Sequence, residues 1–177
     1  MVVGCGCIHM DPAKLSAIAT WPLLKTVKAI QSFLDFCNFY HKFIPGFSNI
    51  VAPLTTLTRK NQPWTWGSEQ QVAFTTLLSH FQTAPMLCLP DMHHPFIVMT
   101  DTSLLASRGV LMQQDGNRDL HPCAYLSQTF SSAERNYDIY DWELLTVIHA
   151  LDHWHHYLQG TSHPVTLLTD HKNLTYF

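Results

Sequence analysis

Phe96-Ile97-Val98-Met99-Thr100, the run that follows Pro95, has the length and the residue types of a buried β-strand. A second apolar run extends from Gly109 to Gln114 and meets the turn signal Asp115-Gly116. A third run, from Cys123 to Leu126, follows this turn. Because strands joined by short connections usually pair as neighbours, the three runs predict an antiparallel meander.

A helix and a returning strand are predicted downstream of this meander. Ser131 and Glu134 have the spacing of a capping box, which favours a helix that runs to about Leu158 and ends at Gly160. The segment from Val165 to Thr169 has the pattern of a last strand, and a right-handed crossover would place it parallel to the first. The second half of the chain therefore predicts a mixed α/β layer.

The segment from Asp11 to about Pro85 has a different period. Its apolar residues recur every three or four positions, which is typical of helices, and helix-breaking residues separate the runs. Candidate helix starts are Thr26, Ser48 and Ser68, the last with Gln71 at capping-box spacing. The first of these helices would stop at Pro45-Gly46, and Pro53 is tolerable only near the first turn of the second. This half predicts a small helical bundle, with a boundary near Asp91.

The composition excludes several classes of protein. The chain has 177 residues, 46% of them hydrophobic, and a formal net charge of −3, so it forms a core and carries no chain-wide basic field. No apolar run approaches the roughly 20 residues that span a bilayer, and the start lacks a secretory signal. We therefore expect an intracellular protein, cytoplasmic or nuclear, that is not secreted and has no membrane partner. The five cysteines are expected to be free thiols.

Three carboxylates stand at the ends of the predicted elements. Asp101 ends the first strand, Asp170 ends the last, and Glu143 precedes an apolar helical stripe formed by Val147, Ala150, Trp154 and Tyr157. If they converge, they form a site for hard divalent cations such as Mg²⁺, and two such ions would promote phosphodiester hydrolysis. The alternative from spacing alone is that both aspartates are turn residues and Glu143 is a surface acid of the helix.

Ordered blocks of residues resemble a known family over essentially the whole chain. In the first half they are Met10-Asp11-Pro12-Ala13-Lys14, Trp21-Pro22, Ser32-Phe33-Leu34, Asn38-Phe39-Tyr40, Lys42-Phe43-Ile44 and Ala52-Pro53-Leu54. In the second half they are Thr100-Asp101, Ala133-Glu134-Arg135-Asn136-Tyr137, Glu143-Leu144-Leu145 and Thr169-Asp170-His171-Lys172-Asn173-Leu174. This ordered set is similar to the reverse transcriptase of gypsy-class long-terminal-repeat retrotransposons and related retroviruses, from the end of the palm through the thumb into ribonuclease H.

The resemblance implies a domain organisation and an activity. Residues 1–17 would be a remnant of the palm edge, residues 18–90 a helical thumb- or connection-like domain, and residues 91–177 a C-terminally truncated ribonuclease H-like mixed sheet with a packed helix. The family performs RNA-directed DNA synthesis and metal-dependent hydrolysis of RNA in RNA/DNA hybrids. Its partners would be such a hybrid or a template-primer duplex, together with the missing palm and the C-terminal part of the polyprotein.

The resemblance also assigns roles to the three carboxylates. Asp101, Glu143 and Asp170 match three of the four acids that bind two Mg²⁺ or Mn²⁺ ions in the family, while the fourth lies further downstream than Phe177. Asp101 would bridge both ions, Glu143 would hold one and sense the RNA 2′-hydroxyl, and Asp170 would hold the ion that carries the attacking water. The paired aspartates of the polymerase site do not occur in this sequence. We expect no DNA synthesis and little or no nuclease activity from this chain alone.

Some residues depart from the family pattern or allow other interpretations. Thr102 and Arg108 stand where the family usually has a small residue and a glycine, and a guanidinium there needs an exit to solvent. These departures favour a second hypothesis, a non-catalytic binding module for nucleic acid or protein retained from a retroelement, or an inactive relic.

Two further groups of residues allow more than one interpretation. The histidines of the predicted helix are interpreted as a solvated face rather than a metal clamp; they are His149, His153, His155 and His156. Phe33, Phe36, Phe39, Tyr40 and Phe43 are interpreted as core rather than as a base-stacking surface.

Overall fold

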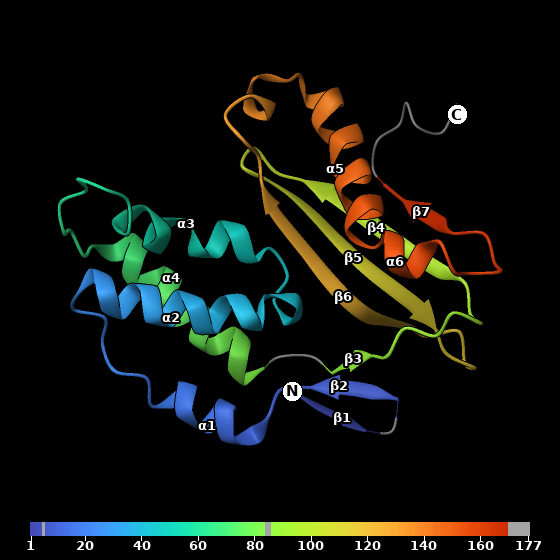
Figure 1. Cartoon of the computed structure of the whole chain (residues 1–177), viewed down its shortest axis with the longest axis horizontal. Helices are drawn as coiled ribbons and strands as arrows, with labels where there is room; N and C mark the ends of the chain where they lie inside the picture. Colours follow the sequence, from blue (N-terminus) through green and yellow to red (C-terminus); the bar gives the residue numbers. More distant parts are fainter. Residues whose placement is uncertain (5, 84–85, 170–177) are drawn as a thin grey trace.

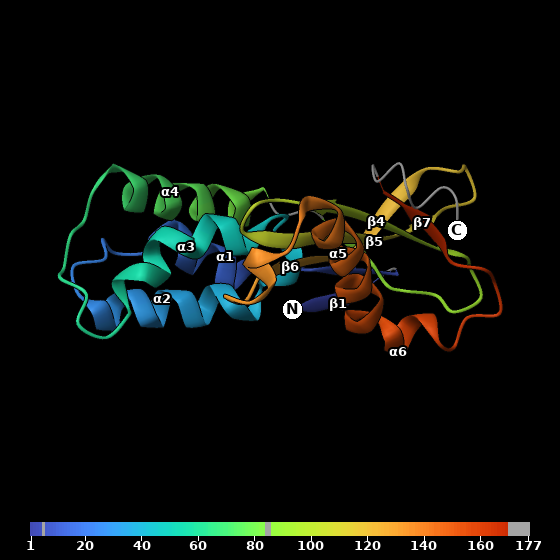
Figure 2. The same ribbon diagram turned by 90° about the horizontal axis from the view of Figure 1, so that it is seen from above.

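A computed structural model describes residues 1–4, 6–83 and 86–169. Helices α1 to α4 lie at one end of the molecule, and a sheet covered by α5 and α6 lies at the other (Figure 1). The view from above shows the same division (Figure 2). Buried apolar side chains form one cluster within each part, and Tyr125 of the sheet packs against the helical cluster. The predicted combination of a helical bundle and a mixed sheet with a packed helix is confirmed.

The helical part follows the predicted periodicity. Its helices are α1 (Pro12–Ala19), α2 (Val27–Phe39), α3 (Phe47–Leu57) and α4 (Ser68–Gln82), and a 3-10 turn, η1 (His41–Phe43), follows α2. Their stripes meet around Phe33, whose ring contacts Trp21 and Phe74 with centroids 5.4 and 5.1 Å away. Burial of these apolar faces holds the four helices together.

The helix starts agree with the sequence only in part. Thr26 caps α2 as predicted, because its Oγ1 accepts from the backbone N–H of Ala29. The prediction for Ser48 is wrong: α3 begins at Phe47 after Gly46, and Ser48 instead donates its hydroxyl to the carbonyl of Ser127 at 2.7 Å. The capping box of α4 lies one residue earlier than predicted, with Gln70 Oε1 accepting from the N–H of Gly67. Local spacing therefore predicts a helix start to within one residue. It does not predict the capping residue at α3, because the Ser48 side chain bonds a distant part of the chain instead.

Two further predictions for the bundle are corrected. Pro53 lies inside α3, beyond its first turn, so the helix continues without the bond that a residue there would donate to the Asn49 carbonyl. Phe39 is 61% exposed and is therefore not a core residue, because it stands at the last position of α2 and points away from the stripe. Phe33, Tyr40 and Phe43 are buried as predicted.

A small antiparallel sheet, absent from the sequence prediction, ties the start of the chain to the segment after the bundle. Strands β1 (Val2–Gly4) and β2 (Cys7–His9) pair with each other, and β2 also pairs with β3 (Leu87–Cys88). Two- and three-residue strands leave too weak a pattern to be recognised from sequence. Leu87 is buried in the helical cluster, so this small sheet packs against the helical bundle.

The main sheet has the strand order β6-β5-β4-β7 in the described part of the chain. Strands β4 (Phe96–Thr102), β5 (Ala106–Gln114) and β6 (Leu120–Thr129) form the predicted antiparallel meander, each longer than predicted. Strand β7 (Thr166–Leu168) pairs in parallel with β4, with Leu168 opposite Met99. The predicted parallel return of the chain is therefore confirmed.

The predicted long helix is broken into shorter elements. Ser131 and Glu134 do form a reciprocal capping box, but it begins a 3-10 turn, η2 (Glu134–Asn136), and not the long helix. Helix α5 (Ile139–His153) starts later, and α6 (His155–Leu158) follows a break at Trp154. Trp154 is 1% exposed and packs on the sheet, where a Cβ added to Gly109 would lie 3.1 Å from its ring. Burial of this large ring stabilises the fold more than the continuation of one straight helix would.

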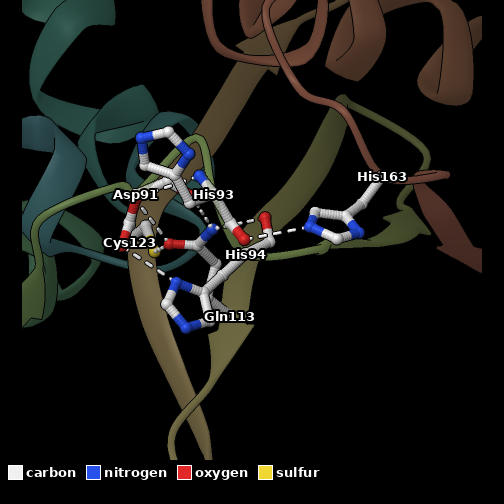
Figure 3. Close-up of polar contacts among 6 residues, drawn as sticks. All are labelled: Asp91, His93, His94, Gln113, Cys123 and His163. Atoms are coloured by element: carbon white, nitrogen blue, oxygen red, sulfur yellow. Dashed lines mark hydrogen bonds and ion pairs between the residues drawn. The ribbon is translucent and has the colours of Figure 1, made fainter.

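A buried glutamine holds the loop that leads into β4 (Figure 3). Gln113 is 6% exposed; its Nε2 donates to the carbonyls of Asp91 and His94, and its Oε1 accepts from the Asp91 N–H. His163, in the loop before β7, contacts the His93 carbonyl at 3.0 Å through Nε2. The loops that precede the two parallel strands are therefore tied together.

Replacing Gln113 with methionine is expected to lower the free energy of unfolding by about 1–3 kcal/mol, because three backbone groups of the Asp91–His94 loop lose their partner while the side-chain volume is kept. Urea denaturation followed by circular dichroism measures this change. Gln114→Met is the matched control, because Gln114 is the exposed neighbour on the same strand. Equal midpoints for the two variants would contradict a structural role for the Gln113 amide.

Candidate functional site

The C-terminal end of β4 places Asp101 on the sheet face that points away from α5. Side chains alternate along a strand, and Thr102 faces α5, since its hydroxyl donates to Thr146 Oγ1 at 2.9 Å. Asp101 therefore points to the opposite face, where it lines a pocket with Gly46 and Tyr125. Its side chain is 58% exposed, so the carboxylate is accessible to solvent and solutes.

Arg108 is the direct neighbour of Asp101 on the adjacent strand. The register of β4 and β5 puts the two residues opposite each other, and Arg108 Nη2 lies 2.8 Å from Asp101 Oδ2. The Arg108 side chain is 37% exposed, which supplies the exit to solvent that the sequence called for. The carboxylate predicted to bind a cation is thus already paired with one.

The end of β7 lies beside Asp101. Thr169, the last described residue, lines one surface pocket together with Leu168, Thr100 and Asp101. The parallel register of β4 and β7 explains this, because parallel strands finish at the same edge of a sheet. Asp170 lies outside the described residues, so its assignment stays a prediction.

Glu143 belongs to the stripe of α5 that faces the sheet. Val147, Ala150 and Trp154 continue that stripe and are buried, while Glu143 itself is half-buried in the first turns of the helix. The bond from Thr102 to Thr146 holds this end of α5 over the end of β4. Asp101 and Glu143 therefore approach the end of β4 from opposite faces of the sheet, and the convergence of the carboxylates stays a prediction.

A polar cluster also ties α5 to the sheet and to η2. His149 Nδ1 lies 2.9 Å from Ser107 Oγ, and its Nε2 lies 3.5 Å from Glu134 Oε1. The Ser131 N–H donates to Glu134, and this bond, with His149 nearby, holds the pKa of the Glu134 carboxyl below its ordinary value. The interpretation of the histidines as a wholly solvated face is thus wrong for His149, which has a side chain only 13% exposed.

A second surface feature joins the two halves of the molecule. A groove between α3 and the end of β6 is lined by Arg59 and Arg135, with polar and apolar residues that include Asn38, Asn49, Leu105 and Thr129. The described residues that line it include no aspartate or glutamate. Asn49 Nδ2 donates to Ser103 Oγ at 3.2 Å, which places the groove beside the end of β4. We call it the arginine groove.

The sequence analysis did not identify Arg59 and Arg135 as a pair of ligand-binding residues. No local signal marks Arg135, because the two residues come from segments that meet only in the folded chain. Arg135 Nε donates to the carbonyl of Phe130 at 3.2 Å, which orients the guanidinium. A groove with two guanidinium groups favours an anionic ligand.

The carboxylate oxygens at the end of β4 are of the type that binds divalent cations. Carboxylate oxygens are the ligands that Mg²⁺ and Mn²⁺ take, and Asp101 is exposed. Within residues 1–4, 6–83 and 86–169, no group of three or more histidines, cysteines or acids is arranged to hold a metal ion. Among the same residues, no helix is long and apolar enough to cross a membrane.

A meander of three strands, a helix across it and a parallel return strand, with Asp101 at the edge where β4 and β7 end, define the class of ribonuclease H-like domains. A family model described as the RNase H-like domain found in reverse transcriptase matches residues 66–167, and the chain belongs to this family. The polyproteins of the transposons Tf2-3 and Tf2-4 of Schizosaccharomyces pombe are each 34% identical over 160 residues, which are 90% of this chain. The chain spans only 12% of the length of these relatives.

Solved structures support the same assignment of the fold. The foamy viral protease-reverse transcriptase in complex with dsDNA aligns with 99% of this chain and 38% of its own, at 22% identity and a TM-score of 0.77. The same type of enzyme in complex with an RNA/DNA hybrid aligns with 95% of this chain and 23% of its own, at 23% identity and a TM-score of 0.75. The resemblance to a retroelement reverse transcriptase and ribonuclease H is therefore confirmed.

Proposed function

We propose that this chain binds RNA/DNA hybrid as the ribonuclease H-like part of a retrotransposon reverse transcriptase, with one strand lying along the arginine groove toward the end of β4. The observation that carries the proposal is the pair Arg59 and Arg135 in a groove whose described lining has no acid. Guanidinium groups bind phosphate oxygens in a forked geometry, and they fix a nucleic acid without reading its sequence. The solved relatives in complex with RNA/DNA hybrid and with dsDNA support a nucleic-acid partner.

The acid site belongs to the same proposal. Ribonuclease H-like domains of reverse transcriptases generally use divalent metal ions. By resemblance to the family, Asp101, Glu143 and Asp170 would hold Mg²⁺ or Mn²⁺, because hard divalent cations take carboxylate oxygens and Asp101 lies where β4 and β7 end. A bound ion would supply electrostatic stabilisation of the phosphodiester under attack. The protein itself positions the backbone of the hybrid through the arginine groove beside this edge.

Binding of a fluorescently labelled RNA/DNA hybrid, measured by anisotropy in EDTA at several salt concentrations, tests the proposal. Two phosphate contacts predict a slope of about −2 for the logarithm of the association constant against the logarithm of the salt concentration. The double variant Arg59→Ala/Arg135→Ala is expected to lose affinity roughly tenfold at moderate salt and to flatten the slope toward zero, because each arginine neutralises about one phosphate.

Arg118→Ala is the matched control, because Arg118 lies beyond the opposite end of β5 and its removal makes half the charge change of the double variant far from the groove. It should bind the hybrid like the unaltered chain, within about twofold. The single variants Arg59→Ala and Arg135→Ala make the same charge change as Arg118→Ala. If all three lose hybrid affinity equally, only net charge matters and the arginine groove is not the binding site. The same mixtures with Mn²⁺, run on a denaturing gel, report any cleavage of the RNA strand.

A further inference from the structure

We infer that Arg108 takes the place of a divalent cation at Asp101, so that metal ions bind this acid site weakly and the chain binds nucleic acid without needing them. The inference rests on the proposed function in treating Asp101 as part of the acid site. It goes beyond that function because Arg108, and not a metal ion, neutralises the negative charge of Asp101. Binding of the hybrid would then be independent of metal.

The geometry at β4 and β5 carries the inference. Arg108 and Asp101 are direct cross-strand partners, and the guanidinium Nη2 is 2.8 Å from the carboxylate Oδ2. A directly opposed pair on neighbouring strands has its Cβ atoms about 5 Å apart, so the contact requires no rearrangement of the backbone. The arginine therefore reaches the carboxylate at a very high effective concentration, which a dissolved ion must overcome.

The surroundings hold the guanidinium in this position. Arg108 passes beneath the turn at Gly46, where an added Cβ would lie 3.7 Å from Arg108 Cδ. Its Nε is buried without a hydrogen-bond partner among the described residues, and Nη2 is the guanidinium atom that contacts Asp101. The turn that belongs to the helical half thus covers an arginine of the sheet.

Coulomb's law predicts that the positive charge of Arg108 weakens the binding of a metal ion at Asp101. A metal ion at Asp101 would stand within a few ångströms of a fixed positive charge, and it would have to displace that charge from the carboxylate. Mg²⁺ also gives up its water reluctantly, which favours the preformed ion pair. The phosphate backbone of a nucleic acid, by contrast, meets a carboxylate that is already neutralised. Metal affinity and hybrid affinity are therefore expected to separate.

Mn²⁺ binding measured by electron paramagnetic resonance tests the inference, because free and bound Mn²⁺ give different signals and no enzyme activity is involved. The variant Arg108→Met keeps the length and apolar packing of the side chain under Gly46 and removes its charge. It is expected to bind Mn²⁺ about tenfold more tightly than the unaltered chain. The double variant Asp101→Asn/Arg108→Met should lose this gain, which would locate the ion at Asp101.

Arg118→Met is the matched control, because it removes the charge of another arginine beyond the far end of the sheet, and its Mn²⁺ affinity should stay within twofold of the unaltered chain. Arg108→Gln is a second variant if the methionine disturbs folding. Asp101→Asn alone, in the presence of Arg108, should change Mn²⁺ affinity less than twofold. A large loss in Asp101→Asn, or no gain in either Arg108 variant, would overturn the inference.

Hybrid binding distinguishes this inference from the proposed function. The unaltered chain is expected to bind the labelled hybrid equally in EDTA and in Mg²⁺, whereas Arg108→Met should bind it more tightly in Mg²⁺ than in EDTA. If the unaltered chain fails to bind the hybrid, the proposed function fails, and the Mn²⁺ titrations still decide the role of Arg108. If the hybrid binds but only with Mg²⁺, the proposed function stands and the inference about Arg108 is wrong.

Discussion

Replacing Trp154 with alanine is expected to lower the free energy of unfolding by about 3–5 kcal/mol, a large part of the roughly 5–15 kcal/mol that stabilises a typical domain. Trp154 is 1% exposed and is among the largest fully buried side chains in the described residues. It fills the space over Gly109 at the break between α5 and α6, so its loss leaves a cavity that the flanking helix ends cannot close. Chemical denaturation followed by circular dichroism measures the change.

The matched control for this variant is Trp64→Ala. Trp64 is 40% exposed and stacks on Trp66 at 6.1 Å between ring centroids, so its removal should change the free energy of unfolding by about 1 kcal/mol or less. A loss below about 1 kcal/mol in Trp154→Ala would show that the sheet cluster is not organised around this ring.

Replacing Phe33 with alanine is expected to cost about 3–5 kcal/mol in the helical half. Phe33 is fully buried, and its edge-to-face contacts with Trp21 and Phe74 connect α2 to the segment before it and to α4. Phe39→Ala is the matched control on the same helix, since Phe39 is 61% exposed, and it should change stability by about 0.5 kcal/mol or less. Equal losses in the two variants would contradict the assigned core.

Hydrogen exchange on the two core variants also tests the proposed division of the chain at residues 90 and 91. If the halves are separate domains, Trp154→Ala should lose amide protection in β4 to β6 and keep it in α2 and α4, and Phe33→Ala should do the reverse. The bonds from Ser48 to Ser127 and from Asn49 to Ser103 cross between the halves. Loss of protection throughout the chain in either variant would mean that these contacts make one cooperative unit.

Much of the fold was predictable because its signals are local. The change from helical period to short apolar runs near Pro90 separates the bundle from the sheet, and the turn Asp115-Gly116 places β5 beside β6. The errors fall where a distant contact competes with a local preference. Ser48 bonds Ser127, 79 residues away, and does not cap α3, and the bulk of Trp154 breaks a helix that local pattern would continue.

The candidate site was predictable in its residue types but not in its arrangement. Asp101 stands at the end of β4 as predicted, and Glu143 lies on the apolar stripe of α5 as predicted. The face of the sheet to which Asp101 points depends on the alternation that Thr102 sets through its bond to Thr146. Arg135 joins Arg59 in one groove only after the helical half packs against β6.

The sequence by itself determined the helical half, the mixed sheet with its order of strands, and the family, because periodicity, capping patterns and ordered motifs are carried by residues close together in the chain. Only the tertiary structure decided that Arg108 neutralises Asp101 and that two arginines share a groove. Cross-strand register and the packing of one half on the other bring together charges from distant segments. Whether such charges attract a metal ion or a polyanion depends on the distances between them, which no local pattern specifies.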